Sequence, residues 1–138
     1  MHPSKQILAA LFVLCSPALA EEPSPGLSIE LNAQASTDAG CLLTFMVNNS
    51  YPQEIESAVF ETVLFNKDSQ VDRLTLFDFG NLPADRPRVR QFQVDGLACD
   101  DLGQVLINGA SICKVGGEDS QLCSALDLNT RIGTELIG

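Results

Sequence analysis

The chemistry available to this chain rests on cysteine sulfur, carboxyl groups and a short run of arginines, because histidine is nearly absent. The 138 residues include 18 Asp and Glu, 8 Lys and Arg, and a single histidine, His2. Catalytic triads, histidine proton shuttles and nearly all catalytic zinc sites require an imidazole ring. If His2 is removed with an export signal, none of these enzyme classes fits the product.

The first twenty residues have the composition of a secretory signal peptide. Lys5 provides a positive charge near the start, residues 7–15 form an apolar run, and Ala18-Leu19-Ala20 places small residues where a signal peptidase reads the chain. The apolar run is too short to cross a bilayer core of about 30 Å, and no twin arginine precedes it. We therefore predict Sec export with cleavage after Ala20, a periplasmic or secreted location, and no membrane insertion of the product.

Five cysteines are present, and four of them follow the predicted cleavage point. Cys15 follows Leu14, where a lipoprotein signal has a small residue, so we interpret it as part of the apolar run. The other four form an even set in an exported chain, which predicts two disulfides in an oxidising compartment. These four are Cys41, Cys99, Cys113 and Cys123.

Three pairings of these cysteines are possible, and the spacing favours one of them. Residues 114–122 contain Gly116-Gly117 and polar side chains, which suit a closed loop between Cys113 and Cys123. Cys41 is then left for Cys99. A zinc site is disfavoured because the exported chain has neither a CxxC pair nor a histidine. The acidic turns lack EF-hand spacing, so we expect no metal and no other cofactor.

The elements that position these residues are predicted to be strands. Apolar and polar residues alternate from Leu27 onward, and turn residues separate the alternating runs. The exported chain starts with an extended leader at 21–26. The predicted strands cover 27–34, 41–48, 56–65, 71–79, 88–94, 104–112 and 126–137.

Several details of this arrangement follow from the pattern. In the first strand, Ala33 falls on the same buried face as Leu27. Strands 56–65 and 71–79 form a hairpin, 88–94 resumes the pairing after a break, and the last strand is continuous. The prediction is one all-β domain over 27–138, an immunoglobulin-like antiparallel β-sandwich of about seven strands with two disulfides. In that architecture, the connections before the second and sixth strands lie at the same end of the sandwich. This placement brings Cys41 and Cys99 together, in independent agreement with the pairing favoured by spacing.

Part of the chain resembles small exported β-sandwich modules of the FxLYD type. Such modules have an Asn-rich turn, an aromatic-rich strand that ends in an acidic or Asn turn, and a Leu-Pro break before a strand with a buried Phe. The matching residues are Asn48-Asn49, residues 63–68, Leu82-Pro83 and Phe92. The exported chain, especially residues 71–108, is also similar to a group of small alphaproteobacterial exported proteins. The first resemblance implies a β-sandwich, the second group has no assigned activity, and neither resemblance implies catalytic residues.

Arginine is concentrated in one run, at Arg86, Arg88 and Arg90. Alternation along a strand would place three guanidinium groups on one face, where they could bind a carboxylate or phosphate of a partner. The favoured alternative is a set of cross-strand ion pairs. The acidic residues considered as their partners are Glu54, Glu56, Glu61 and Asp72.

Two phenylalanines, Phe77 and Phe79, share one face of a predicted strand. Packing in the core is the favoured interpretation. The alternative is that they form an exposed anchor for a binding partner.

The functional prediction is a non-catalytic binding or accessory protein of the cell envelope that contacts another envelope protein. The exported chain has a net charge of −11, from 18 acidic and seven basic residues, which disfavours nucleic acid as a binding partner. One alternative is an inhibitor of an exported enzyme that acts through the Cys113–Cys123 loop. A carboxylate-based hydrolase is less favoured, because eighteen acidic residues produce some close pair by chance and a sandwich of this size has little mass for a cleft.

Overall fold

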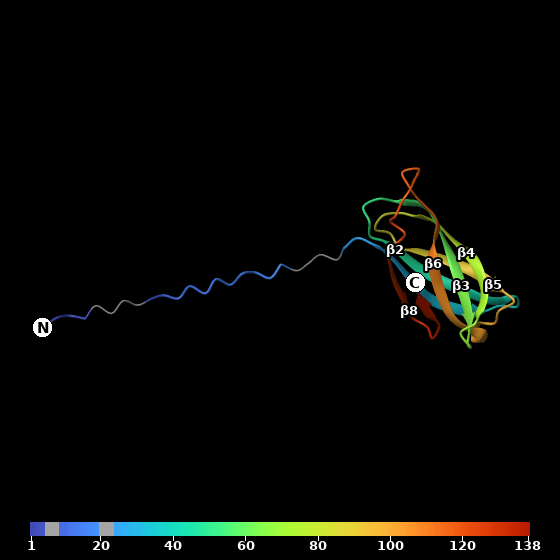
Figure 1. Ribbon diagram of the computed structural model, residues 1–138, viewed down its shortest axis with the longest axis horizontal. Coiled ribbons are helices and arrows are strands. Elements are labelled where there is room, and N and C mark those ends of the chain that lie inside the picture. The colour runs from blue at the N-terminus through green and yellow to red at the C-terminus, as the bar shows by residue number, and fades with distance from the viewer. Residues whose placement is uncertain (5–8, 20–23) are drawn as a thin grey trace.

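The computed structural model describes residues 1–4, 9–19 and 24–138 (Figure 1). Residues 9–19 form no helix or strand, and Leu11 and Phe12 are 90% and 91% exposed. The N-terminal trace runs away from a body of strands that begins at Leu27. The cleavage predicted after Ala20 and the start of the leader predicted at 21–26 lie outside the described residues. Within the described ranges, no helix is long and apolar enough to cross a membrane.

The body of the chain is built from strands and one short 3-10 turn, η1, at Cys99–Asp101. The strands are β1 Leu27–Ser36, β2 Gly40–Asn49, β3 Ile55–Asn66, β4 Val71–Leu82, β5 Arg88–Asp95, β6 Leu102–Val115, β7 Glu118–Asp119, β8 Leu126–Thr130 and β9 Glu135–Ile137. One sheet has the order β5-β2-β1-β8, and the other has the order β4-β3-β6-β7 with β9 also paired to β6. The two sheets confirm the predicted all-β sandwich.

The buried faces follow the alternation in the sequence. In β1, Leu27 and Ile29 are fully buried, and in β2 the same is true of Cys41, Leu43 and Phe45. The residues between them are intermediate in exposure. Because successive side chains of a strand point to opposite faces, each strand contributes one apolar face to the space between the sheets.

A bulge in β1 reverses this alternation and corrects the prediction for Ala33. The register with β2 shifts between Leu31 and Ala33, so Gln34 lies opposite the buried Leu43. One extra residue in a strand exchanges the two faces beyond the bulge. Gln34 Oε1 accepts a hydrogen bond of 3.0 Å from the hydroxyl of Thr134, which is only 2% exposed. The inward-facing amide oxygen therefore has a hydrogen-bond partner.

Strand β5 pairs with β2 and not with β4, so the expectation that it resumes the hairpin pairing is wrong. The hairpin itself is confirmed, since β3 and β4 are antiparallel. Between β4 and β5, Pro83 and Pro87 lack the amide hydrogen that a continuing ladder requires. The chain crosses there to the other sheet, where Phe92 lies opposite Leu43.

The segment predicted as one strand over 126–137 is two strands in different sheets. β8 pairs with β1 and β9 pairs with β6, and both pairings are parallel. The link between them is fixed by the hydroxyl of Thr130, which donates to the Thr134 carbonyl at 2.9 Å. The Arg131 amide also donates to the Leu31 carbonyl at 3.0 Å. The last residues therefore connect the two sheets.

Five phenylalanines fill the centre of the sandwich. Phe77 and Phe92 stack with ring centroids 4.2 Å apart, and Phe79 makes edge contacts with Phe45, Phe60 and Phe92. Such offset and edge arrangements are the favourable geometries for aromatic rings. Phe77 is 3% exposed and Phe79 is fully buried, so the core interpretation of these two residues is confirmed and the exposed-anchor alternative is wrong.

Both predicted disulfides are present. Cys41 at the start of β2 is bonded to Cys99 in η1, and Cys113 in β6 is bonded to Cys123 before β8. The first bond links the two sheets at one end of the sandwich, because η1 leads directly into β6. The second closes a loop beside the edge of β6.

We predict that Glu30→Gln makes the free energy of unfolding less dependent on pH in the acidic range. A hydrogen bond from Asn32, and then the guanidinium of Arg131, lower the pKa of Glu30 from its ordinary value of 4.5. Asn32 Nδ2 and Arg131 Nε both lie 2.8 Å from Glu30 Oε1. A carboxylate with a lowered pKa stabilises the fold above its unfolded pKa, and this contribution is lost as the pH falls through the folded pKa.

The measurement is urea unfolding of both proteins at pH 7 and near pH 3. The variant should be less stable than the native protein at pH 7, and the difference should shrink at the acidic pH. Glu118→Gln, at an exposed position in β7, is the matched control. A difference that persists unchanged at low pH would contradict the assigned role of the carboxylate.

Candidate binding groove at the edge of strand β6

Strand β6 has one edge that is only partly covered. β3 pairs with β6 along most of its length, from Leu102 to Lys114. On the opposite edge, β9 pairs with residues 104–106 and β7 pairs with residues 114–115. Among the described residues, no strand pairs with this edge between 107 and 113. An uncovered strand edge presents backbone N–H and C=O groups that can pair with another chain.

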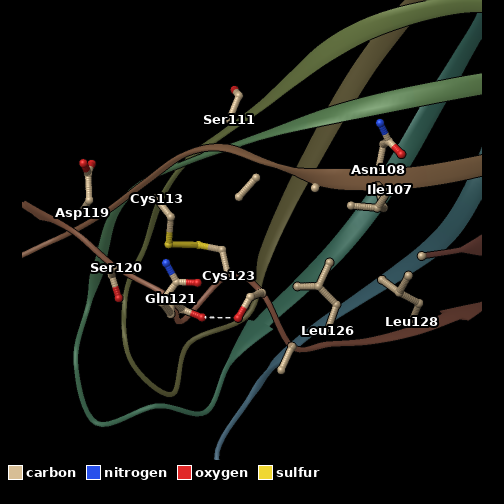
Figure 2. Close-up of a pocket in the computed structure, with 15 residues that line it drawn as sticks. Ile107, Asn108, Ser111, Cys113, Asp119, Ser120, Gln121, Cys123, Leu126 and Leu128 are labelled. Carbon is tan, nitrogen blue, oxygen red and sulfur yellow. Dashed lines mark hydrogen bonds between the residues drawn. A yellow bond between two sulfur atoms is a disulfide. The ribbon is translucent and has the colours of Figure 1, made fainter.

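A groove of about 660 Å³ lies beside this edge (Figure 2). One wall is β6 from Ile107 to Cys113, and the other is the segment from Asp119 through β8. Figure 2 shows Leu126 and Leu128 pointing from β8 toward β6, where Ile107 lies. These three side chains and the Cys113–Cys123 disulfide give the groove an apolar floor. Gly109, Ala110, Ala125 and Gly138 also line the groove. Polar side chains lie at its rim. They are Asn108, Ser111, Asp119, Ser120, Gln121 and Ser124.

The sequence of β6 explains why its edge remains open. The register with β3 shifts on either side of Gly109-Ala110, which leaves Asn108 and Ser111 as the extra residues of two bulges. Bulges bend a strand and interrupt its ladder. Asn108 turns to Glu61, donating from Nδ2 to Oε1 at 2.6 Å. The residues between the bulges have small side chains and are exposed, so another backbone can approach closely.

The loop between β6 and β8 forms a fixed wall of the groove. The disulfide closes it, and the Ser120 amide donates to the Cys113 carbonyl at 2.9 Å. The Ser124 hydroxyl donates to the Gln121 carbonyl at 2.6 Å, the bond drawn in Figure 2. An ion pair of 2.6 Å between Lys114 Nζ and Asp119 is largely exposed, so it contributes little. The covalent bond and the backbone contacts therefore hold the wall.

The groove offers binding groups and not a pair of catalytic acids. Among the described residues of its lining, Asp119 has the one acidic side chain, whereas glycoside hydrolysis uses two acidic side chains. In the described part of the chain, no group of three or more His, Cys, Asp or Glu residues could hold a metal ion. What the groove presents is a strand edge, an apolar floor and hydrogen-bonding side chains, of which Asp119 is charged.

The three arginines singled out by sequence lie elsewhere. Arg86 precedes β5, while Arg88 and Arg90 alternate along its inward side, opposite Val47 and Phe45 of β2. They therefore do not form one stripe of three on a strand face.

The expected ion pairs of these arginines are also absent. The ion pairs within residues 1–4, 9–19 and 24–138 are Arg73–Asp72, Lys114–Asp119 and Arg131–Glu30. The pairing with Glu54, Glu56, Glu61 or Asp72 is wrong because β5 belongs to the other sheet.

Arg90 instead has a structural role between the sheets. Its Nε donates to the Phe79 carbonyl at 2.6 Å, and its Nη2 donates to the Asn81 carbonyl at 2.9 Å. These carbonyls flank Gly80, whose φ of +67° interrupts the regular strand. The guanidinium thus satisfies edge carbonyls of β4, and it is occupied within the fold.

Sequence reasoning did not single out the groove. The available signal was Asn108-Gly109-Ala110-Ser111, a run of small and polar residues inside a predicted strand, which is typical of a bulge or of close backbone approach. Comparison of the chain with protein-family models, curated proteins and solved structures finds no match in any of the three.

Proposed function

We propose that this chain is an exported, non-catalytic binding protein of the cell envelope that holds an extended segment of a partner protein along the free edge of β6. Two disulfides suggest an oxidising compartment outside the cytoplasm. The signal-like first twenty residues, with Leu11 and Phe12 exposed and away from the sandwich, support export to the periplasm or beyond.

The uncovered edge between residues 107 and 113 carries this proposal. Because the Cys113 carbonyl already accepts from the Ser120 amide, the free stretch is residues 108–112. Five residues of strand span about 17 Å, which suits an added segment of about five residues. Adding a strand to a sheet edge gives affinity through main-chain hydrogen bonds, and alternate side chains enter the adjacent pocket. Here that pocket is the floor of Ile107, Leu126 and Leu128. The partner segment would therefore place apolar side chains at alternate positions.

The fixed wall of the groove favours binding. A ligand that docks against a loop already ordered by a disulfide loses less conformational entropy than one that must order the loop. The loop here is closed over a sequence separation of only 10 residues. This arrangement supports a preformed site.

The test is site-specific photo-crosslinking from position 111 in cells that export the protein. We expect a discrete adduct from position 111 and none from position 35, an exposed alanine near the end of β1. Ala110→Trp should reduce the adduct about tenfold, because a large ring on the exposed edge blocks the approach of another strand. Ala35→Trp is the matched control and should leave it unchanged. Equal labelling from both positions would reject the proposal.

A second function, inhibition of an exported enzyme, is favoured by the shape of the loop. Figure 1 shows the orange segment between β6 and β8 projecting from the end of the sandwich. Its side chains include Asp119, whose side chain is 89% exposed. A constrained projecting loop is a form that can enter an active-site cleft. An adduct from position 117 without one from position 111 would favour this function over strand addition.

A further inference from the structure

The sheet of β4, β3, β6 and β9 has an outer face on which one row of side chains is apolar across all four strands. The pairing register places Leu74, Val63, Leu106 and Ile137 in one continuous row. Three further rows lie beside it on the same face. In these rows Val71 is opposite Phe65, Leu76 is opposite Glu61, and Val59 is opposite both Asp78 and Ile112. We call this four-row surface the outer face. It lies on the opposite side of the sheet from the phenylalanine core.

Five apolar side chains of the outer face are well exposed, whereas Val59 and Val63 between them are only 7% and 6% exposed. Val71 and Leu74 are each 60% exposed, Leu76 is 59%, Ile112 is 43% and Ile137 is 40%. Single exposed apolar residues are ordinary, but a contiguous group on one face marks an interaction surface. Four strands spaced about 4.8 Å apart and four rows along them cover roughly 400 Å². That area is about half of one side of a standard protein interface.

The charges in the four rows of the outer face have one sign. These rows contain Glu61, Asp78 and Glu135, and they contain no Lys or Arg. Lys114 lies in the next row, beyond Ile112, and it is paired with Asp119 of β7. Each carboxylate accepts a hydrogen bond from a neutral donor, namely Asn108, the Gly80 amide and Gln104. Within residues 1–4, 9–19 and 24–138, none of the three takes part in an ion pair. The apolar centre is thus bordered by carboxylates without cationic partners.

We propose that the outer face is a second docking surface, which binds a protein whose contact patch has an apolar centre and a border of Lys or Arg. Three unpaired carboxylates attract cationic side chains and repel an anionic lipid surface. A second copy of this chain fits poorly, since it would bring the same carboxylates together and carries a net charge of −10 itself. Together with the β6 groove, the outer face would let the protein contact two partners at once.

The probe is an amphipathic helical peptide of Leu and Lys, whose leucine stripe is bordered by lysines. A helix cannot add to the β6 edge as a strand, so its binding reports on a face and not on the groove. Fluorescence anisotropy should show binding that weakens as salt is raised. The corresponding Leu and Glu peptide should not bind. Ala110→Trp should leave the affinity for the Leu and Lys peptide unchanged, so failure of the groove proposal and failure of this one are distinguishable.

Variants of the outer face locate the binding. The double change Leu74→Gln and Leu76→Gln should weaken binding at least about tenfold. Val89→Gln is the matched control, because Val89 is 58% exposed on β5 of the other sheet. Glu61→Gln combined with Asp78→Asn should remove most of the salt dependence. All these side chains are partly or fully exposed, so the variants should fold, which their thermal unfolding will show.

Three results would overturn the proposal. The first is equal binding of the Lys and Glu peptides. The second is an equal loss of binding in Val89→Gln and in the double leucine variant. The third is a dimer in sedimentation equilibrium that the double leucine variant dissociates, which would make a second copy the occupant.

Discussion

Replacing Cys41 and Cys99 together with alanine is expected to lower the free energy of unfolding by about 4 kcal/mol. The bond closes a sequence separation of 58 residues, and in the chain-entropy model a longer closed loop restricts the unfolded chain more. A small domain is stable by only about 5–15 kcal/mol, so this loss is a large fraction of the total. Both residues are buried at 5% exposure or less, and alanine keeps the site apolar.

The second disulfide provides an internal comparison. Cys113 and Cys123 are 10 residues apart, so the same model gives about 3 kcal/mol for their replacement by alanine. Urea unfolding of both double variants measures the difference. If the Cys113 and Cys123 variant were the less stable of the two, native contacts of the loop, and not restriction of the unfolded chain, would dominate.

The two disulfides also differ in their expected effect on function. Removing the Cys113–Cys123 bond frees one wall of the groove, so under the proposed function the crosslink from position 111 should weaken in a folded variant. The Cys41–Cys99 bond lies near the other end of β6, before Leu102, so its removal leaves that wall intact. At temperatures below its unfolding midpoint, the variant without this bond should retain the crosslink. Stability and binding are thereby separated.

The fold was largely predictable because local pattern and global architecture agree. Alternation in residues 41–47 gave the buried face of β2 directly, and an even cysteine set in a sandwich gave both disulfides. Where the prediction failed, the cause was an irregularity that alternation does not report. The bulge after Leu31 moved Gln34 inward, and the link at Thr130–Thr134 divided the last strand between two sheets.

The candidate site was less predictable for a related reason. Its defining feature is a missing neighbour, the uncovered edge of β6 from 107 to 113, and a sequence pattern identifies a strand without identifying its partners. The arginine run illustrates the opposite error. Its residue type suggested a ligand site or ion pairs, but Arg90 satisfies carbonyls of β4, a role that depends on the crossing of β5 to the other sheet.

Phe79→Ala is expected to destabilise the fold by about 3–5 kcal/mol, the usual cost of truncating a buried phenylalanine. Phe79 is fully buried and makes edge contacts with rings from both sheets, Phe45 and Phe92 on one side and Phe60 on the other. Its removal would leave a cavity at the centre, where neighbours from two sheets cannot collapse freely. Urea unfolding measures the loss.

Leu76→Ala on the same strand is the matched control for this change. Leu76 is 59% exposed on the outer face, so its truncation should alter the free energy of unfolding by no more than about 0.5 kcal/mol. The two residues thus separate the functions of the two faces of β4, because the inward face stabilises the sandwich and the outward face is free for binding. A similar loss in both variants would mean that Leu76 is covered in solution, which a second copy on the outer face would explain. A small loss in Phe79→Ala would contradict the buried position of its ring.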